Sequence, residues 1–124
     1  MLVLLSALPV QAVEPAPALP VRILYDGGAA CASPREFREA VRQRAPELAD
    51  AGSDDAAREF KVGVSRGTDD VLRGMVEISE PSGANATRRL DGHDCTEIVG
   101  ALAFIVAELG RAVSIEGDAD TPAE

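Results

Sequence analysis

The chain has 124 residues, 21 of them acidic and 12 basic, which gives a formal net charge of −9 at pH 7. This length fits a single domain with a limited core. Because the chain has only one Tyr, three Phe and no Trp, that core must be built from aliphatic side chains. The negative charge argues against general nucleic-acid binding, which depends on the neutralisation of phosphates by basic residues.

The N-terminal residues 1–12, MLVLLSALPVQA, form an apolar run. They resemble the apolar region and cleavage site of a secretory signal peptide, although no Lys or Arg precedes Arg22, so the true start is expected to lie upstream. The run is too short to span a bilayer. Residues 13–20 are rich in Pro and Ala, which predicts an extended linker. An export signal places the protein in the periplasm or outside the cell, where two cysteines more often form a disulfide than a catalytic pair.

The first folded elements are a strand and a helix. Residues 21–26, VRILYD, alternate in the direction of their side chains and predict a β-strand. A helix is expected to follow, because Ser33 is a good N-cap, Pro34 suits the first helical position and Glu36 completes a capping box. Pro46 should end or kink this helix shortly before it.

Three further strands are predicted over residues 60–65, 71–79 and 86–91. The first two alternate between apolar and polar residues, whereas the third is short and mostly polar. The connecting segments RGTDD and EPSGAN are rich in turn-forming residues. These strands therefore predict an antiparallel meander.

A second helix is predicted from its N-cap Asp94, with Glu97 in a further capping-box arrangement, to a stop at Gly110. Its body is apolar on nearly all sides, which is typical of the central helix of a core, and it is too short to span a bilayer. Residues 112–124 are acidic and are predicted to form a disordered tail, with an edge strand over residues 112–116 as the alternative. Three small residues of the second helix are expected to let it lie close to the sheet: Gly100, Ala103 and Ala107.

Together these elements predict one α+β domain over residues 21–111, in the order β-α-β-β-β-α, with two helices packed on one face of a small, mostly antiparallel sheet. In this order both helices begin at the same end of the sheet. Cys31 precedes the first helix and Cys95 lies in the first turn of the second. The topology thus brings both to one edge, where a disulfide requires Cα atoms within about 7 Å. Closing so long a loop should stabilise the fold by about 4 kcal/mol.

Cys95 has other interpretations. As a catalytic nucleophile it would need a base, and His93, the only histidine, lies two residues away, a spacing at which side chains rarely face each other. A metal site would have to combine both cysteines with His93 and Asp94, which lack the usual ligand spacing. An anion between the two helix N-termini is disfavoured, because acidic side chains already occupy the first turns. The disulfide is the simplest prediction, with no catalytic residue, no metal site and no cofactor.

The face of the sheet away from the helices is expected to carry four basic residues, with Leu24, Met75 and Glu77 among them. On an acidic protein they form a candidate surface for an acidic partner, such as an anionic polymer of the cell envelope. The alternative is a solvated face whose long side chains shield the apolar spots. The four basic residues are Arg22, Lys61, Arg73 and Arg89.

The pattern VRILYDGGAACASPREFREAV, followed by FKVGVSRG, LRGMVEIS and TRRLDGHDCTEIVGALAFIVAEL, resembles a class of uncharacterised exported bacterial domains. These have a cysteine before the first helix, a meander, and a second cysteine that opens an Ala- and Leu-rich last helix. The resemblance covers residues 21–109. In topology alone, the core is also similar to the C-terminal domains of TonB and TolA, envelope proteins that bind partners through sheet edges. The resemblance implies a non-enzymatic interaction module and assigns no binding residues.

These observations predict an exported, non-enzymatic interaction module of the cell envelope, periplasmic or secreted. Its expected partner is an envelope protein or an anionic polymer rather than nucleic acid. The sequence fixes neither the identity of the partner nor the oligomeric state. A thiol-dependent enzyme or redox protein using Cys95 is the alternative, and thiol titration of the folded protein separates the two. A protein inhibitor or pro-segment is a third function of small two-helix α+β domains, for which the sequence gives no sign.

Overall fold

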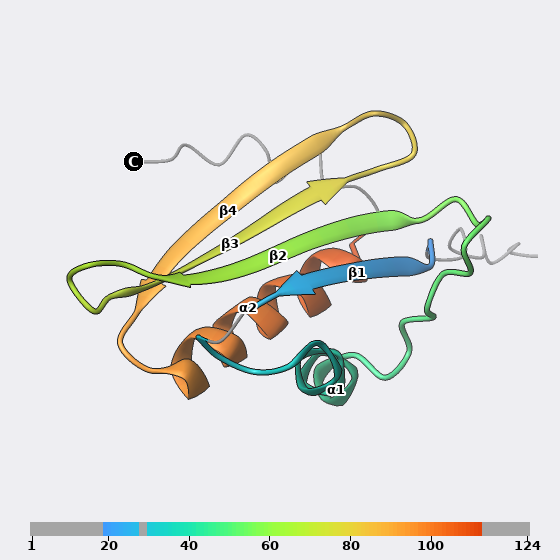
Figure 1. Ribbon diagram of the computed structural model, residues 1–124. Helices are drawn as coiled ribbons and strands as arrows, with labels where there is room; N and C mark the ends of the chain where they lie inside the picture. The colour runs from blue at the N-terminus through green and yellow to red at the C-terminus, as the bar shows by residue number, and fades with distance from the viewer. Residues whose placement is uncertain (1–18, 28–29, 113–124) are drawn as a thin grey trace, which may run out of the picture.

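Figure 1 shows a computed structural model of the protein, which describes residues 19–27 and 30–112. The described chain forms two helices and a four-stranded sheet, which confirms the predicted α+β fold and the predicted order of elements. Each predicted boundary lies within two residues of the observed one. The elements are β1 (Val21–Asp26), α1 (Pro34–Arg44), β2 (Arg58–Arg66), β3 (Leu72–Ser79), β4 (Asn85–Gly92) and α2 (Cys95–Gly110).

The strands lie in the order β1-β2-β3-β4. β1 runs parallel to β2, and the pairs β2–β3 and β3–β4 are antiparallel. Both helices lie on one face of the sheet, as predicted, with α1 beneath β1 and α2 beneath the other strands (Figure 1). The opposite face is not covered by any element of the described chain, and we call it the open face.

The core lies between the sheet and the two helices and is mostly aliphatic, as the composition requires. Its aromatic members include Tyr25 and Phe37, whose rings stack with their centroids 4.6 Å apart. Burial raises the pKa of the Tyr25 hydroxyl, and the nearby carboxylates of Glu36 and Asp26 add to this shift. The largest fully buried side chains are those of Phe37, Phe60, Leu72, Val76, Ile78, Ile98, Leu102 and Val106.

The start of α1 has the predicted capping box. The Ser33 hydroxyl accepts a hydrogen bond from the backbone N–H of Glu36 at 3.1 Å, and the Glu36 carboxylate accepts one from the backbone N–H of Ser33 at 2.8 Å. This second bond is the main reason that the pKa of Glu36 is lowered. The helix ends at Arg44, two residues before Pro46, because the residue before a proline is disfavoured in helical conformation.

The start of α2 differs from the prediction in one detail. Asp94 is the N-cap, and its side chain accepts a hydrogen bond from the N–H of Glu97 at 2.7 Å. The Glu97 carboxylate, however, accepts from the backbone N–H of His93 at 3.0 Å, one residue before the N-cap. A carboxylate at this position can reach either amide, and here it satisfies the earlier one.

One of the three small residues that were predicted to bring α2 close to the sheet faces a different element. Ala103 and Ala107 are buried, but a Cβ added to Gly100 would lie nearest to Nη2 of Arg44, at 3.5 Å, so Gly100 faces α1 rather than the sheet. The glycine that permits close packing of α2 on the sheet is Gly74 of β3. A Cβ at Gly74 would lie only 3.0 and 3.1 Å from the methyl carbons of Leu102.

A buried arginine connects the end of α2 to the sheet. Arg58, the first residue of β2, is 2% exposed. Its guanidinium donates hydrogen bonds to the carbonyl oxygens of Leu109 and Ala112 and forms an ion pair with Glu80. Arg58 was not predicted to be part of the sheet, because the strand was expected to begin at residue 60. The C-terminal carbonyls of a helix carry partial negative charge, so a cation at this position is favourable.

Three predicted segments lie wholly or mostly outside the described residues. The predicted signal-like segment (residues 1–12), most of the linker (13–20) and all but the first residue of the predicted tail (112–124) lie outside the described residues. Among the described helices, neither is long and apolar enough to cross a membrane.

Candidate functional site

The two cysteines form the predicted disulfide. Cys31 and Cys95 are bonded, with their Cα atoms 5.3 Å apart. They are the only cysteines in the sequence, so neither sulfur is a free thiol in this state. No group of three or more His, Cys, Asp or Glu side chains within residues 19–27 and 30–112 is placed to hold a metal ion. The disulfide therefore joins the segment before α1 to the start of α2 and leaves no free thiol for chemistry.

The open face carries the four predicted basic residues. It also carries four acidic residues, of which only one was predicted to lie there. Glu77 was recognised, whereas Asp26, Glu59 and Asp91 were not. The strand register pairs Arg22 with Glu59, Lys61 with Glu77, and Arg73 with Asp91. Opposite charges on directly facing residues stabilise a sheet. Three of the four basic residues thus face an acidic one, and the face has no excess of positive charge.

Two of these basic residues also have contacts near turns. Arg22 donates hydrogen bonds to the carbonyl oxygens of Gly52 and Asp55, at 2.7 and 3.2 Å. Arg73 forms an ion pair with Asp69, at 3.1 Å. The pKa of Asp69 is lowered, first by the backbone N–H of Val71 and then by the Arg73 side chain. Arg22 and Arg73 therefore help to hold the segments that precede β2 and β3.

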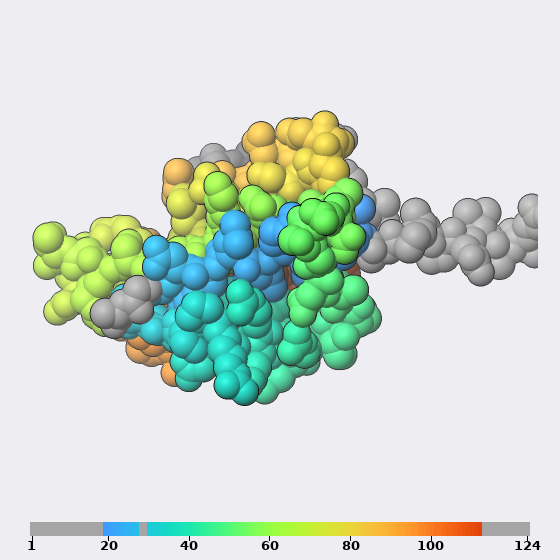
Figure 2. All heavy atoms as spheres, turned by 45° about the vertical axis from the view of Figure 1, so that its right-hand side comes forward, coloured from blue at the N-terminus to red at the C-terminus, as the bar shows by residue number. Residues whose placement is uncertain are grey.

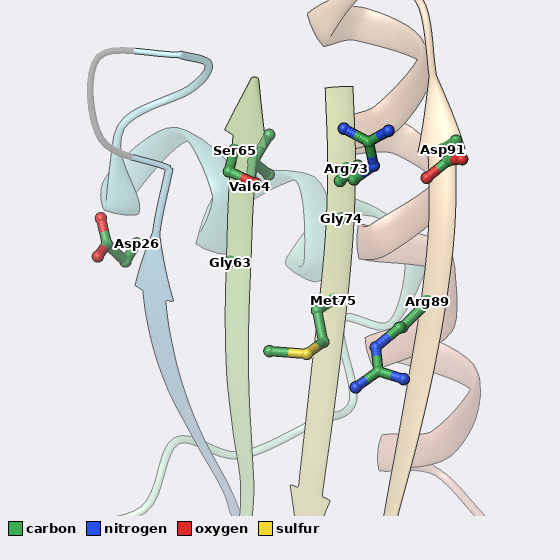
Figure 3. A pocket seen from close by; sticks show the side chains of 9 residues that line it. All are labelled: Asp26, Gly63, Val64, Ser65, Arg73, Gly74, Met75, Arg89 and Asp91. Atoms are coloured by element: carbon green, nitrogen blue, oxygen red, sulfur yellow. The ribbon is translucent and has the colours of Figure 1, made fainter. Parts of the chain in front are cut away.

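Arg89 of β4 has a different neighbour. It faces Met75 of β3, which in turn faces Gly63 of β2, and Gly63 faces Asp26 of β1. Since Gly63 has no side chain, this row of residues contains a hollow of about 400 Å³, whose lining also includes Arg73 and Asp91. Figure 3 shows Met75 extending toward β2 and the Arg89 guanidinium extending toward β3 beside it. We call this the Gly63 hollow.

Only two of the four predicted binding residues lie at the Gly63 hollow. Arg73 and Arg89 line the Gly63 hollow, whereas Arg22 and Lys61 do not. The sequence already contained a signal for the hollow, because a glycine inside an alternating strand often marks a close approach of a ligand or of another backbone. The neighbours of Gly63 were not predictable without the strand register.

The two edges of the sheet are also unlike each other. The start of β1 is covered by the loop between α1 and β2. The N–H of Val21 donates to the carbonyl of Ala49, and the carbonyl of Val21 accepts from the N–H of Ala51, each at 2.8 Å. Figure 2 shows this loop lying beside the start of β1. No segment of the described chain pairs with the outer edge of β4.

The hydrogen-bond pattern identifies the backbone groups at this outer edge. The N–H of Glu80 donates to the carbonyl of Ala84, so these facing residues form a hydrogen-bonded pair next to the β3–β4 ladder. Hydrogen-bonded and non-bonded pairs alternate along an antiparallel ladder. It follows that every second residue of β4 directs its N–H and C=O away from β3. These residues are Asn85, Thr87, Arg89 and Asp91.

The helix-bearing side of β4 combines apolar and basic residues, because Arg88 alternates onto it between Ala86 and Leu90. Leu90, whose side chain lies on the helix-bearing face, is only half-buried. On α2, which packs beneath the sheet, Ile105 is also only partly buried. An additional strand beside β4 would therefore place alternate side chains toward the charged residues of the open face and toward Arg88 and Leu90 on the other face.

Comparison with known proteins adds no family to this description. No protein-family model matches the chain, and the search of curated proteins found no match.

Proposed function

We propose that this chain is a non-enzymatic interaction module of an exported cell-envelope protein, and that it binds an extended segment of a partner protein as an additional strand on β4. One observation carries the proposal: within the described residues the outer edge of β4 is unpaired, whereas the start of the β1 edge is covered. An unpaired edge presents free N–H and C=O groups to an incoming strand. The same kind of contact is implied by the topological resemblance to TonB and TolA C-terminal domains.

Two further observations support this proposal. The disulfide Cys31–Cys95 fits an oxidising compartment such as the periplasm, where such bonds persist. The equal numbers of acidic and basic residues on the open face favour a protein partner over an anionic polymer, because a polymer would need an excess of positive charge.

A thiol-dependent enzyme is supported by no feature of the described chain. Both sulfurs are held in the disulfide, and a thiolate nucleophile would appear only after reduction. Thiol titration of the folded, unreduced protein tests this directly. We expect no reactive thiol, and one rapidly reacting thiol per chain would instead support the enzyme.

A proline at Thr87 tests the strand addition. The N–H of Thr87 points away from β3, so Thr87→Pro should remove an outward donor and leave the ladder intact. Thr87→Val keeps the N–H and is the matched control. In affinity capture from an envelope extract, we expect wild type and Thr87→Val to retain a partner that Thr87→Pro loses. Amide hydrogen exchange of the complex should slow at Thr87 and Arg89.

Circular dichroism of both variants belongs to this experiment. If Thr87→Pro retains the partner as well as Thr87→Val does, the β4 edge is not the binding surface. If Thr87→Pro alone loses its fold, its N–H is needed within the sheet and the assignment of outward groups is wrong.

A further inference from the structure

We propose that the Gly63 hollow binds a small molecule that combines a flat apolar group with one carboxylate. This site shares Arg89 and Asp91 with β4, but it uses their side chains rather than the outer backbone edge and does not depend on the proposed function.

The fold does not require a glycine at position 63. A Cβ added there would meet nothing closer than the carbonyl oxygen of Asp26, at 3.8 Å, which is an ordinary contact. Its backbone also lies outside the left-handed region, because Gly83 is the one glycine with positive φ among the described residues. Glycine inside a strand is destabilising. A cost that packing and backbone geometry do not explain is consistent with space being kept open above this position.

Met75 supplies the apolar side of the hollow. It faces Gly63 across the β2–β3 ladder, is partly buried, and extends toward β2 in Figure 3. The thioether of methionine makes favourable contacts with the edges of aromatic rings. A flat ring resting on the backbone of Gly63 would have this sulfur beside it.

Arg89 supplies the charged side. It is the one basic residue of the open face that has no acidic residue directly opposite, because it faces Met75. A guanidinium binds a carboxylate through two parallel hydrogen bonds, which fixes the orientation of the ligand as well as its position. Arg89 can therefore hold the carboxylate of a ligand whose ring lies over Met75 and Gly63.

The remaining charges around the hollow define the ligand further. Arg73 is paired with Asp69 and faces Asp91, and Asp26 lies on the far side of Gly63. The lining thus contains two basic and two acidic residues, so it exerts little long-range attraction on a polyanion. A single carboxylate placed next to Arg89 is the charge that fits. The volume, about 400 Å³, is near the lower end for small-molecule sites and suits one fused ring system.

Titration with 2-naphthoate tests the charge requirement, with the neutral 2-naphthamide as the matched ligand. In ¹⁵N-resolved NMR spectra we expect saturable shifts of the amides of Gly63, Met75 and Arg89. The amide ligand should bind about tenfold more weakly, because it loses the ion pair. Arg89→Gln should weaken naphthoate binding by a similar factor. Lys61→Gln, which removes the same charge on the same face but outside the hollow, should leave it unchanged.

Gly63→Val tests the role of the missing side chain. The branched side chain should fill the hollow and abolish naphthoate binding, while the midpoint of thermal unfolding stays the same or rises. A lower midpoint would show that the fold itself needs the glycine and would overturn the proposal. Unchanged binding by Gly63→Val, or equal affinity for naphthoate and naphthamide, would overturn it as well.

Discussion

Gly74 and Gly63 lie on neighbouring strands, but on opposite faces of the sheet, and they have opposite surroundings. A Cβ at Gly74 would lie too close to the methyl groups of Leu102, whereas a Cβ at Gly63 would make only an ordinary contact with the carbonyl oxygen of Asp26. On the covered face, the side chain is missing because a helix needs the room. On the open face nothing in the described chain uses the room, and this difference is what makes the Gly63 hollow a candidate site.

The same contrast holds for charge. On the covered face, Arg58 is buried and bonded to Glu80 and to the end of α2. On the open face, Lys61, in the same strand, is exposed. A charged side chain on one face is therefore part of the framework, and on the other it is in contact with solvent.

The largest change in the free energy of unfolding is expected at Arg58. Arg58→Ala leaves Glu80 buried without its partner and removes the cation at the end of α2, so we expect a loss of about 3–5 kcal/mol in the free energy of unfolding. Lys61→Ala, the control in the same strand, should change it by less than about 0.5 kcal/mol. Urea denaturation measures both. Similar losses for the two variants would contradict the burial of Arg58.

An intermediate effect is expected from valine at the two glycines. Gly74→Val would force Leu102 or β3 to move, so we expect a loss of about 1–3 kcal/mol in unfolding free energy. Gly63→Val should be neutral or raise it by up to about 1 kcal/mol. Comparing the two denaturation midpoints checks this, and the comparison between the faces fails if the two variants change stability in the same direction.

The smallest effect is expected at the exposed start of α1. The capping box lowers the pKa of Glu36 below its ordinary value of 4.5. The ionised form is thus favoured in the folded state, so its contribution is present above that ordinary value and is lost as pH falls through the lowered pKa. Glu36→Gln should therefore show a shallower fall in unfolding midpoint between about pH 6 and about pH 3. Parallel curves for the variant and wild type would exclude this contribution.

Much of the fold was predictable because its signals are local. Ser33, Pro34 and Glu36 define the start of α1 by their own chemistry, and Asp94 does the same for α2. The disulfide followed from the order of elements, since two helices that leave the same end of a sheet bring Cys31 and Cys95 together.

The features that escaped prediction depend on contacts between distant segments. Arg58 has the sequence appearance of a loop residue, and only the position of Leu109 and Glu80 shows why it is buried. The acids Asp26 and Asp91 could have been placed on the open face by strand alternation alone, whereas Glu59 precedes the predicted strand and joins the face only because β2 begins at Arg58. Their pairing with particular basic residues required the register, as did the row that joins Gly63 to Met75 and Arg89.

The disulfide has a mechanical consequence. Cys31 follows β1 and Cys95 opens α2, so the covalent path between the two ends of the described chain passes through the S–S bond and leaves out residues 32–94. A force that pulls on both ends can detach β1 or unwind α2, but the loop containing α1 and strands β2 to β4 cannot be drawn out to its full length. Reduction would add that whole segment to the extension, which a single-molecule pulling experiment would record as a longer contour.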